Sequence, residues 1–183
     1  MLRRMLMMLA LCALAACATG VRGSAEAESR IADAGHSRTQ ELMDQLVGHW
    51  VLTGAVAGQN VVHDVDAAWA LQGNYVRIGE VARERGANGQ PEYEATIFVG
   101  WHEDSNRYVC IWLDNTEVAS GGISCTASPT QDSIPFEFRN EHGTLVLATT
   151  FTYHRLDDTW DWQINNVDNG NVTPFATLSL RRR

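Results

Sequence analysis

Two cysteines, Cys110 and Cys125, are the residues of this sequence best suited to react with each other. They lie fifteen positions apart in two consecutive segments that have the composition of β-strands. Cysteines on neighbouring strands can face each other at disulfide distance, although spacing alone does not decide the geometry. We therefore predict a disulfide, with two buried free thiols as the alternative. Neither cysteine has an adjacent His or Arg that would make its thiol reactive.

Five aromatic residues form the best candidate for a binding wall. They share the inward face of three predicted strands, as judged from the alternation of apolar and polar residues. Aromatic walls with a few polar groups suit an apolar guest, whereas large rings also fill ordinary β cores. We predict a ligand-binding set, with a purely structural core as the alternative. The set comprises Trp69, Tyr93, Trp101, Trp160 and Trp162.

Other reactive groups give no catalytic or metal site. The stretch His63-Asp64-Val65-Asp66 resembles a metal cluster, but alternation places both aspartates on the opposite face from His63, and we expect a solvated strand end. The acids Asp157, Asp158 and Asp161 fall at a turn and on an outward face. The sequence contains no Gly-x-Ser-x-Gly, His-Glu-x-x-His or Cys-x-x-Cys motif and no lysine, which excludes a Schiff-base mechanism. We predict no catalytic residue, no metal and no cofactor.

The elements that must position these residues are short strands. We count about ten, separated by turns rich in Gly, Asn and Asp, and find no alternation of strands with helices. The sequence predicts an all-β fold, a single closed antiparallel barrel, preceded by a short helix over residues 37–46. The predicted strands cover residues 46–54, 63–71, 75–81, 92–101, 107–114, 118–126, 134–139, 144–154, 158–164 and 175–180.

The first sixteen residues have the pattern of a secretory signal peptide. Arg3 and Arg4 precede an apolar stretch, which ends in Leu14-Ala15-Ala16-Cys17. This ending resembles the lipobox of bacterial lipoproteins, in which Cys17 would become the lipidated first residue. An ordinary cleaved signal is the alternative. Residues 17–36 are small and polar and would form a flexible tether, so that residues 37–183 make up the barrel domain.

The signal and the charge suggest where the protein resides. Secretion implies an oxidising compartment, which favours the disulfide. Ala18 follows Cys17 where a retention aspartate would stand, so by resemblance to lipoprotein sorting we expect an anchor in the outer membrane, facing the periplasm. Loss of Arg3 and Arg4 leaves 12 basic and 22 acidic residues, a formal charge of −10. We therefore expect no nucleic-acid partner.

Several motifs in order resemble a known family. Leu46-Val47-Gly48-His49-Trp50, Trp69-x-Leu71-x-Gly73-x-Tyr75, Val99-Gly100-Trp101 and Tyr108-x-Cys110-x-Trp112-x-Asp114 resemble a bacterial family of unknown function with a lipocalin-like, calycin-type barrel. The resemblance implies that Trp50 packs at the closed end of the barrel, with Arg181 as its partner. Some haem-binding barrels of similar shape use a strand histidine, a role open to His154, but nothing else in the sequence supports haem.

The sequence leaves two functions open. The first is a lipoprotein, anchored through Cys17, whose barrel binds or carries a small apolar molecule. The second is an accessory envelope lipoprotein with a filled core and no ligand, which acts by contact with an unidentified protein. Because no catalytic set is present, an enzyme is the least favoured class.

Overall fold

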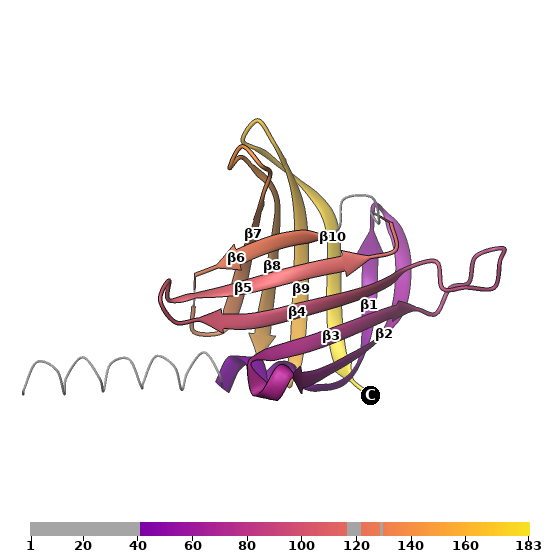
Figure 1. Cartoon of the computed structure of the whole chain (residues 1–183). Coiled ribbons are helices and arrows are strands. Elements are labelled where there is room, and N and C mark those ends of the chain that lie inside the picture. Colours follow the sequence, from indigo (N-terminus) through magenta and orange to yellow (C-terminus); the bar gives the residue numbers. More distant parts are fainter. Residues whose placement is uncertain (1–40, 117–121, 129) are drawn as a thin grey trace, which may run out of the picture. The chain divides into compact units, whose positions relative to one another are not determined.

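Ten antiparallel strands close into a single barrel in the computed structural model, which describes residues 41–116, 122–128 and 130–183 (Figure 1). The predicted signal peptide, the lipidated Cys17 and the tether lie outside these residues. The strands are β1 (Gly48–Val56), β2 (Gln59–Ala70), β3 (Tyr75–Ala82), β4 (Glu94–His102), β5 (Arg107–Asp114), β6 (Ile123–Ala127), β7 (Ser133–Arg139), β8 (Leu145–His154), β9 (Thr159–Asp168) and β10 (Asn171–Arg182).

Each strand pairs with its neighbours in sequence, and β1 pairs with β10 to close the ring. The closure runs from Trp50 opposite Arg182 to Val56 opposite Ala176. It removes the unpaired edges through which open sheets aggregate. The predicted all-β fold, with one closed antiparallel barrel of about ten strands and a short helix, is confirmed.

Strand boundaries differ from the prediction where turns were not recognised. β2 begins at Gln59, four residues before the predicted start at His63, because Ala57 and Gly58 form a tight turn with φ of 48° and 80°. Turns of this handedness match the twist of the strands that they join. At its other end β2 stops at Ala70, one residue before the predicted end at Leu71. Leu71 lies in a 3-10 turn (Leu71–Gly73) with φ of 49° and is 64% exposed.

The disulfide is present between Cys110 of β5 and Cys125 of β6. The two residues are directly opposed in the strand pair, with their Cα atoms 5.0 Å apart. The prediction of a disulfide is therefore confirmed, and the alternative of two free thiols is wrong. The bond links the two strands whose connecting segment includes residues 117–121, which lie outside the described residues.

One end of the barrel is closed by the N-terminal helix, which covers residues 41–46. Leu42, Met43 and Leu46 have the helical spacing that the sequence predicts, and each is at most 2% exposed. They enter the same core as the inward side chains of the strands. The helix therefore seals this end, which Figure 1 shows at the lower edge of the barrel, and we call it the closed end.

A tryptophan and an arginine hold the helix to the first and last strands. Trp50 is fully buried and donates from Nε1 to the Leu46 carbonyl oxygen (2.8 Å). The Arg182 guanidinium lies 3.8 Å from the centre of the Trp50 ring and donates to the Val47 carbonyl (2.7 Å). A Cβ at Gly48, which has φ of 141°, would collide with this guanidinium, so a glycine is required there.

Arg182 thus takes the place that was expected of Arg181. The error is one of register: Trp50 is opposite Arg182, so the two share the inner face, whereas Arg181 is opposite Val51 and exposed. Side chains alternate along a strand, and a shift of one residue moves a side chain to the other face.

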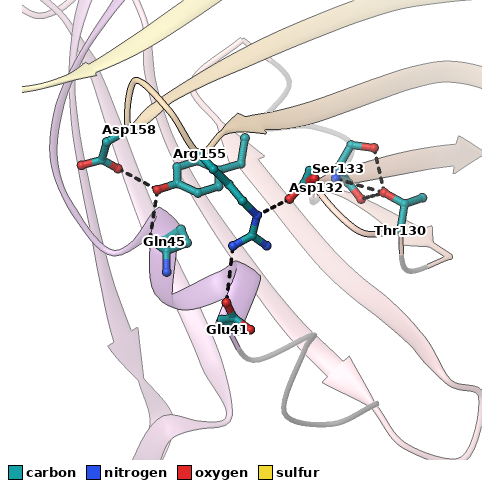
Figure 2. Close-up of polar contacts among 8 residues, drawn as sticks. Glu41, Gln45, Thr130, Asp132, Ser133, Arg155 and Asp158 are labelled. Carbon is teal, nitrogen blue, oxygen red and sulfur yellow. Dashed lines mark hydrogen bonds and ion pairs between the residues drawn. The ribbon is translucent and has the colours of Figure 1, made fainter. Parts of the chain in front are cut away.

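Further polar contacts fasten the helix to the turns beneath the barrel (Figure 2). Arg155 donates to Asp132 (2.6 Å) and reaches Glu41 of the helix (3.4 Å). The Tyr153 hydroxyl lies 3.1 Å from Gln45 Oε1 and 3.0 Å from Asp158 Oδ1. The helix is consequently held by Tyr153 at the end of β8 and by Arg155 in the β8–β9 turn.

Asp158 connects this network to Arg182. Arg182 Nε donates to Asp158 Oδ2 (2.9 Å), and this hydrogen bond lowers the pKa of the Asp158 carboxyl. The folded state therefore binds fewer protons at Asp158 than the unfolded chain does. The stabilisation is complete above the unfolded pKa of about 4 and is lost as the pH falls through the lower, folded value.

Replacement of Arg182 tests this arrangement. We expect Arg182→Gln to lower the free energy of unfolding by about 1–2 kcal/mol at neutral pH, because it removes the stack on Trp50 and the donors to Val47 and Asp158. The loss should shrink in acid, where Asp158 is protonated in both proteins. Urea denaturation at several pH values measures it. Arg181→Gln is the matched control and should change stability by less than about 0.5 kcal/mol; equal effects of the two substitutions would contradict this account.

Candidate functional site

A cavity of about 500 Å³ lies within the barrel toward the end opposite the helix, which we call the open end. Its lining reaches the β1–β2 turn at Val56 and Gln59, and the β3–β4 connection at Glu84 and Glu92. These positions are at the far ends of their strands from Trp50 and the helix. A cavity of this size is in the range of sites for small organic molecules.

Most of the cavity wall is apolar. Trp162 is 1% exposed and stacks on Phe151 with ring centres 4.2 Å apart, which fixes its orientation. Trp112 contacts Phe138 edge to face, with ring centres 6.2 Å apart. Aliphatic side chains complete this surface, among them Val61, Leu147, Ile164 and Leu178.

A buried His–Glu pair interrupts the apolar wall. Nδ1 of His63 on β2 and Oε1 of Glu80 on β3 are hydrogen-bonded at 2.5 Å, and the two residues are 4% and 3% exposed. Both line the cavity. Among the described residues, no hydrogen bond involves the other ring nitrogen, Nε2. A carboxyl group bonded to one ring nitrogen holds the imidazole in one orientation.

Tyr93 packs beside this pair. Its ring stacks on His63 with centres 5.6 Å apart, and its hydroxyl oxygen accepts a hydrogen bond from Trp112 Nε1 (3.2 Å). Burial, and to a lesser extent the charge of Glu80, raises the pKa of the Tyr93 hydroxyl well above its usual value. Tyr93 therefore keeps its proton at physiological pH and remains a neutral hydrogen-bonding group.

Two other polar atoms of the wall have no partner among the described residues. They are Oγ1 of Thr149 on β8 and Nε1 of Trp162 on β9, in residues that are 0% and 1% exposed. Both residues line the cavity. Buried polar groups are nearly always hydrogen-bonded, so such atoms beside a cavity call for an explanation.

The mouth of the cavity carries negative charge. Glu84, Glu92 and Asp114 line it, and the described lining residues include no arginine. Glu84 and Glu92 are exposed, and Asp114 is half-buried. The potential at the entrance therefore disfavours anions.

The structure divides the predicted aromatic set between the two ends of the barrel. Tyr93 and Trp162 line the cavity. Trp160 is fully buried at the closed end, where it donates to the Gln45 carbonyl (3.3 Å). Trp69 donates to Asp44 of the helix (2.8 Å), and Trp101 packs edge to face on Tyr108. The alternation that predicts an inward face does not indicate to which end a side chain belongs.

His63, Glu80 and Trp112 line the cavity, although the sequence analysis assigned none of them to the binding set. His63 was expected at a solvated strand end, which is wrong because β2 extends beyond it to Gln59. Glu80 lies on the same face of β3 as Val76, Ile78 and Ala82, all of which are buried. The alternation of apolar residues in this segment therefore indicates that the Glu80 carboxyl group lies inside the barrel.

The remaining polar candidates lie outside the barrel. His154 is exposed and pairs with Asp161 at 2.8 Å, so its ring does not enter the cavity. Among residues 41–116, 122–128 and 130–183, no three His, Cys, Asp or Glu side chains gather in a way that could hold a metal ion. No helix in these ranges has the length and apolar character to cross a bilayer.

Comparison with known proteins adds no assignment. No protein-family model matches the chain, and no curated protein does so. The function must therefore be argued from the cavity itself.

Substitutions in the His63–Glu80 pair test whether the stability of the fold depends on the pair. His63→Phe alone leaves the Glu80 carboxyl buried without its partner, and we expect a loss of about 3 kcal/mol in the free energy of unfolding. His63→Phe combined with Glu80→Leu should be within about 1 kcal/mol of the wild type, because apolar groups then replace both partners. Urea denaturation measures both variants. A double variant as unstable as the single one would show that the fold itself needs the pair.

Proposed function

We propose that the barrel binds a small, mainly apolar molecule in the cavity at its open end. The observation that carries this proposal is a cavity of about 500 Å³ whose wall combines aromatic and aliphatic side chains with a few polar groups. Wide apolar surfaces with a small number of polar groups are typical of sites for small molecules. The order of the sequence motifs, which resembles the lipocalin-like calycin barrels, agrees with such a role.

The closed end supports a carrier rather than a channel. The helix, Trp50 and Arg182 block that end, so a guest would enter and leave only by the open end. A pocket with one entrance shields an apolar molecule from water on all other sides. The alternative, an accessory protein with a filled core, accounts less well for a cavity of this size.

The proposal includes a location. Lipidation of Cys17 would anchor the protein to the outer membrane, with the tether holding the barrel in the periplasm. There the protein would bind apolar molecules released from, or passing between, the membranes of the envelope. The disulfide between Cys110 and Cys125 agrees with an oxidising compartment.

A cavity-filling substitution tests the proposal. Leu147 lines the cavity, whereas the neighbouring Val146 is 41% exposed on the outer face. We expect the wild type to bind the neutral fluorophore N-phenyl-1-naphthylamine with a saturable rise in emission. Leu147→Trp should weaken this binding at least about tenfold, because the indole occupies the space. Val146→Trp adds the same group outside the barrel and should bind like the wild type.

Circular dichroism shows whether both variants fold. The proposal is contradicted if folded wild type does not bind the fluorophore saturably, or if Leu147→Trp and Val146→Trp have the same affinity.

A further inference from the structure

The carboxylate of Glu80 has a partner for only one of its two oxygens among the described residues. Oε1 is hydrogen-bonded to His63, whereas no hydrogen bond of these residues engages Oε2. Glu80 is 3% exposed and lines the cavity. The described side-chain atoms that are both unpartnered and sealed from solvent are Thr149 Oγ1 and Trp162 Nε1, and Oε2 is not one of them. Oε2 therefore retains surface that a molecule in the cavity can contact.

The negative charge of Glu80 also has no cation beside it in the wall. An ionised carboxylate only accepts hydrogen bonds, so the hydrogen that it shares with His63 belongs to Nδ1. A neutral imidazole satisfies one oxygen in this way without cancelling the charge. The described lining residues contain no arginine, and the chain contains no lysine. Because a buried charge without a partner is costly, a cation in the cavity would be stabilised there.

A second carboxylate acts on the same part of the cavity. Asp114 lies two positions after Trp112 on β5, so the two side chains share a face, and both line the cavity. Burial is the main cause of the raised pKa of the Tyr93 hydroxyl, and the charges of Glu80 and Asp114 both add to it. The two acids, from β3 and β5, are therefore within electrostatic reach of one hydroxyl group in the cavity wall.

Aromatic rings lie beside these acids. The Tyr93 ring stacks on His63, and its hydroxyl oxygen accepts a hydrogen bond from Trp112 Nε1. Aromatic faces attract cations as well as apolar groups. A wall that combines carboxylates with aromatic and aliphatic side chains thus suits a molecule with an apolar body and one positive charge.

We propose that the guest is an apolar molecule that carries a protonated amine, and that this amine donates a hydrogen bond to Glu80 Oε2. This inference depends on the binding function proposed above, and it names the class of ligand. An ammonium group supplies both the N–H donor and the positive charge that the Glu80 carboxylate lacks. The cavity selects amines over alcohols of the same shape, and the acids at its mouth select against fatty acids and other carboxylates.

Three naphthalenes that differ in one group provide the test. They are 2-naphthylmethylamine, which is protonated at neutral pH, 2-naphthalenemethanol and 2-naphthoate, each measured by displacement of N-phenyl-1-naphthylamine. In the wild type we expect the amine to bind about tenfold more tightly than the alcohol, because a charge-assisted hydrogen bond replaces a neutral one. The carboxylate should bind most weakly.

The variant Glu80→Gln removes the charge and keeps an oxygen that can accept from His63 Nδ1. We expect the amine to fall to the affinity of the alcohol, while the affinities of the alcohol and the fluorophore stay within about threefold of the wild type. Asp104→Asn is the matched control, because it removes one negative charge from the exposed β4–β5 turn at the closed end. It should bind all four compounds like the wild type, and circular dichroism shows whether both variants fold.

The outcomes distinguish the two proposals. If the fluorophore binds but the wild type does not prefer the amine to the alcohol, or if the preference survives in folded Glu80→Gln, the assignment of Glu80 is overturned and the binding function stands. The ranking in the wild type decides the point whatever the stability of Glu80→Gln. If neither the fluorophore nor any of the three naphthalenes binds folded wild type, the binding function fails and this inference with it.

Discussion

The stack of Arg182 on Trp50 is the interaction on which the rest of the structure depends. It joins β1 to β10 where the barrel closes. The same two side chains also hold the helix at the closed end, because Trp50 donates to the Leu46 carbonyl and Arg182 donates to the Val47 carbonyl. Trp50 and the apolar residues of the helix fill the closed end of the barrel. The molecule therefore has one packed end and one end that contains a cavity of about 500 Å³.

The hollow end retains polar groups that a purely structural core would not need. Replacement of a buried polar pair by apolar residues is often neutral or stabilising, so the His63–Glu80 pair and the unpartnered Thr149 and Trp162 are not explained by stability. The two groups lie on separate walls of the barrel. His63 and Glu80 belong to β2 and β3, whereas Thr149 and Trp162 belong to β8 and β9. Strands β1 and β10 separate the two walls on one side, and β4 to β7 separate them on the other. The His63–Glu80 pair lines the cavity, and the proposed guest would meet it there.

The sequence was sufficient for the fold but only partly so for the site. Turn residues and the alternation of apolar and polar residues predict the strands, because both signals are local. The disulfide could be predicted because it depends on only one strand pairing, that of β5 with β6. The position of a side chain along the barrel axis depends on the register of all ten strands, which no single segment encodes. Consequently Trp160 and Trp162, two residues apart on one face, could not be assigned to the closed end and to the cavity. The resemblance implies Arg181 as the partner of Trp50, but the register of β1 and β10 gives this position to Arg182. The Ala57-Gly58 turn starts β2 at Gln59, so His63 lies inside the strand rather than at its end.

Native mass spectrometry of residues 18–183, produced by periplasmic expression and purified without added lipid, tests the central claim most directly. The account predicts a folded protein that carries one small, mainly apolar molecule, released on denaturation, on a chain two hydrogens lighter than its reduced mass because of the Cys110–Cys125 bond. If the molecule is lost during purification, the protein should take up N-phenyl-1-naphthylamine added in its place. A folded, oxidised chain that carries nothing and takes up no apolar molecule would contradict the account.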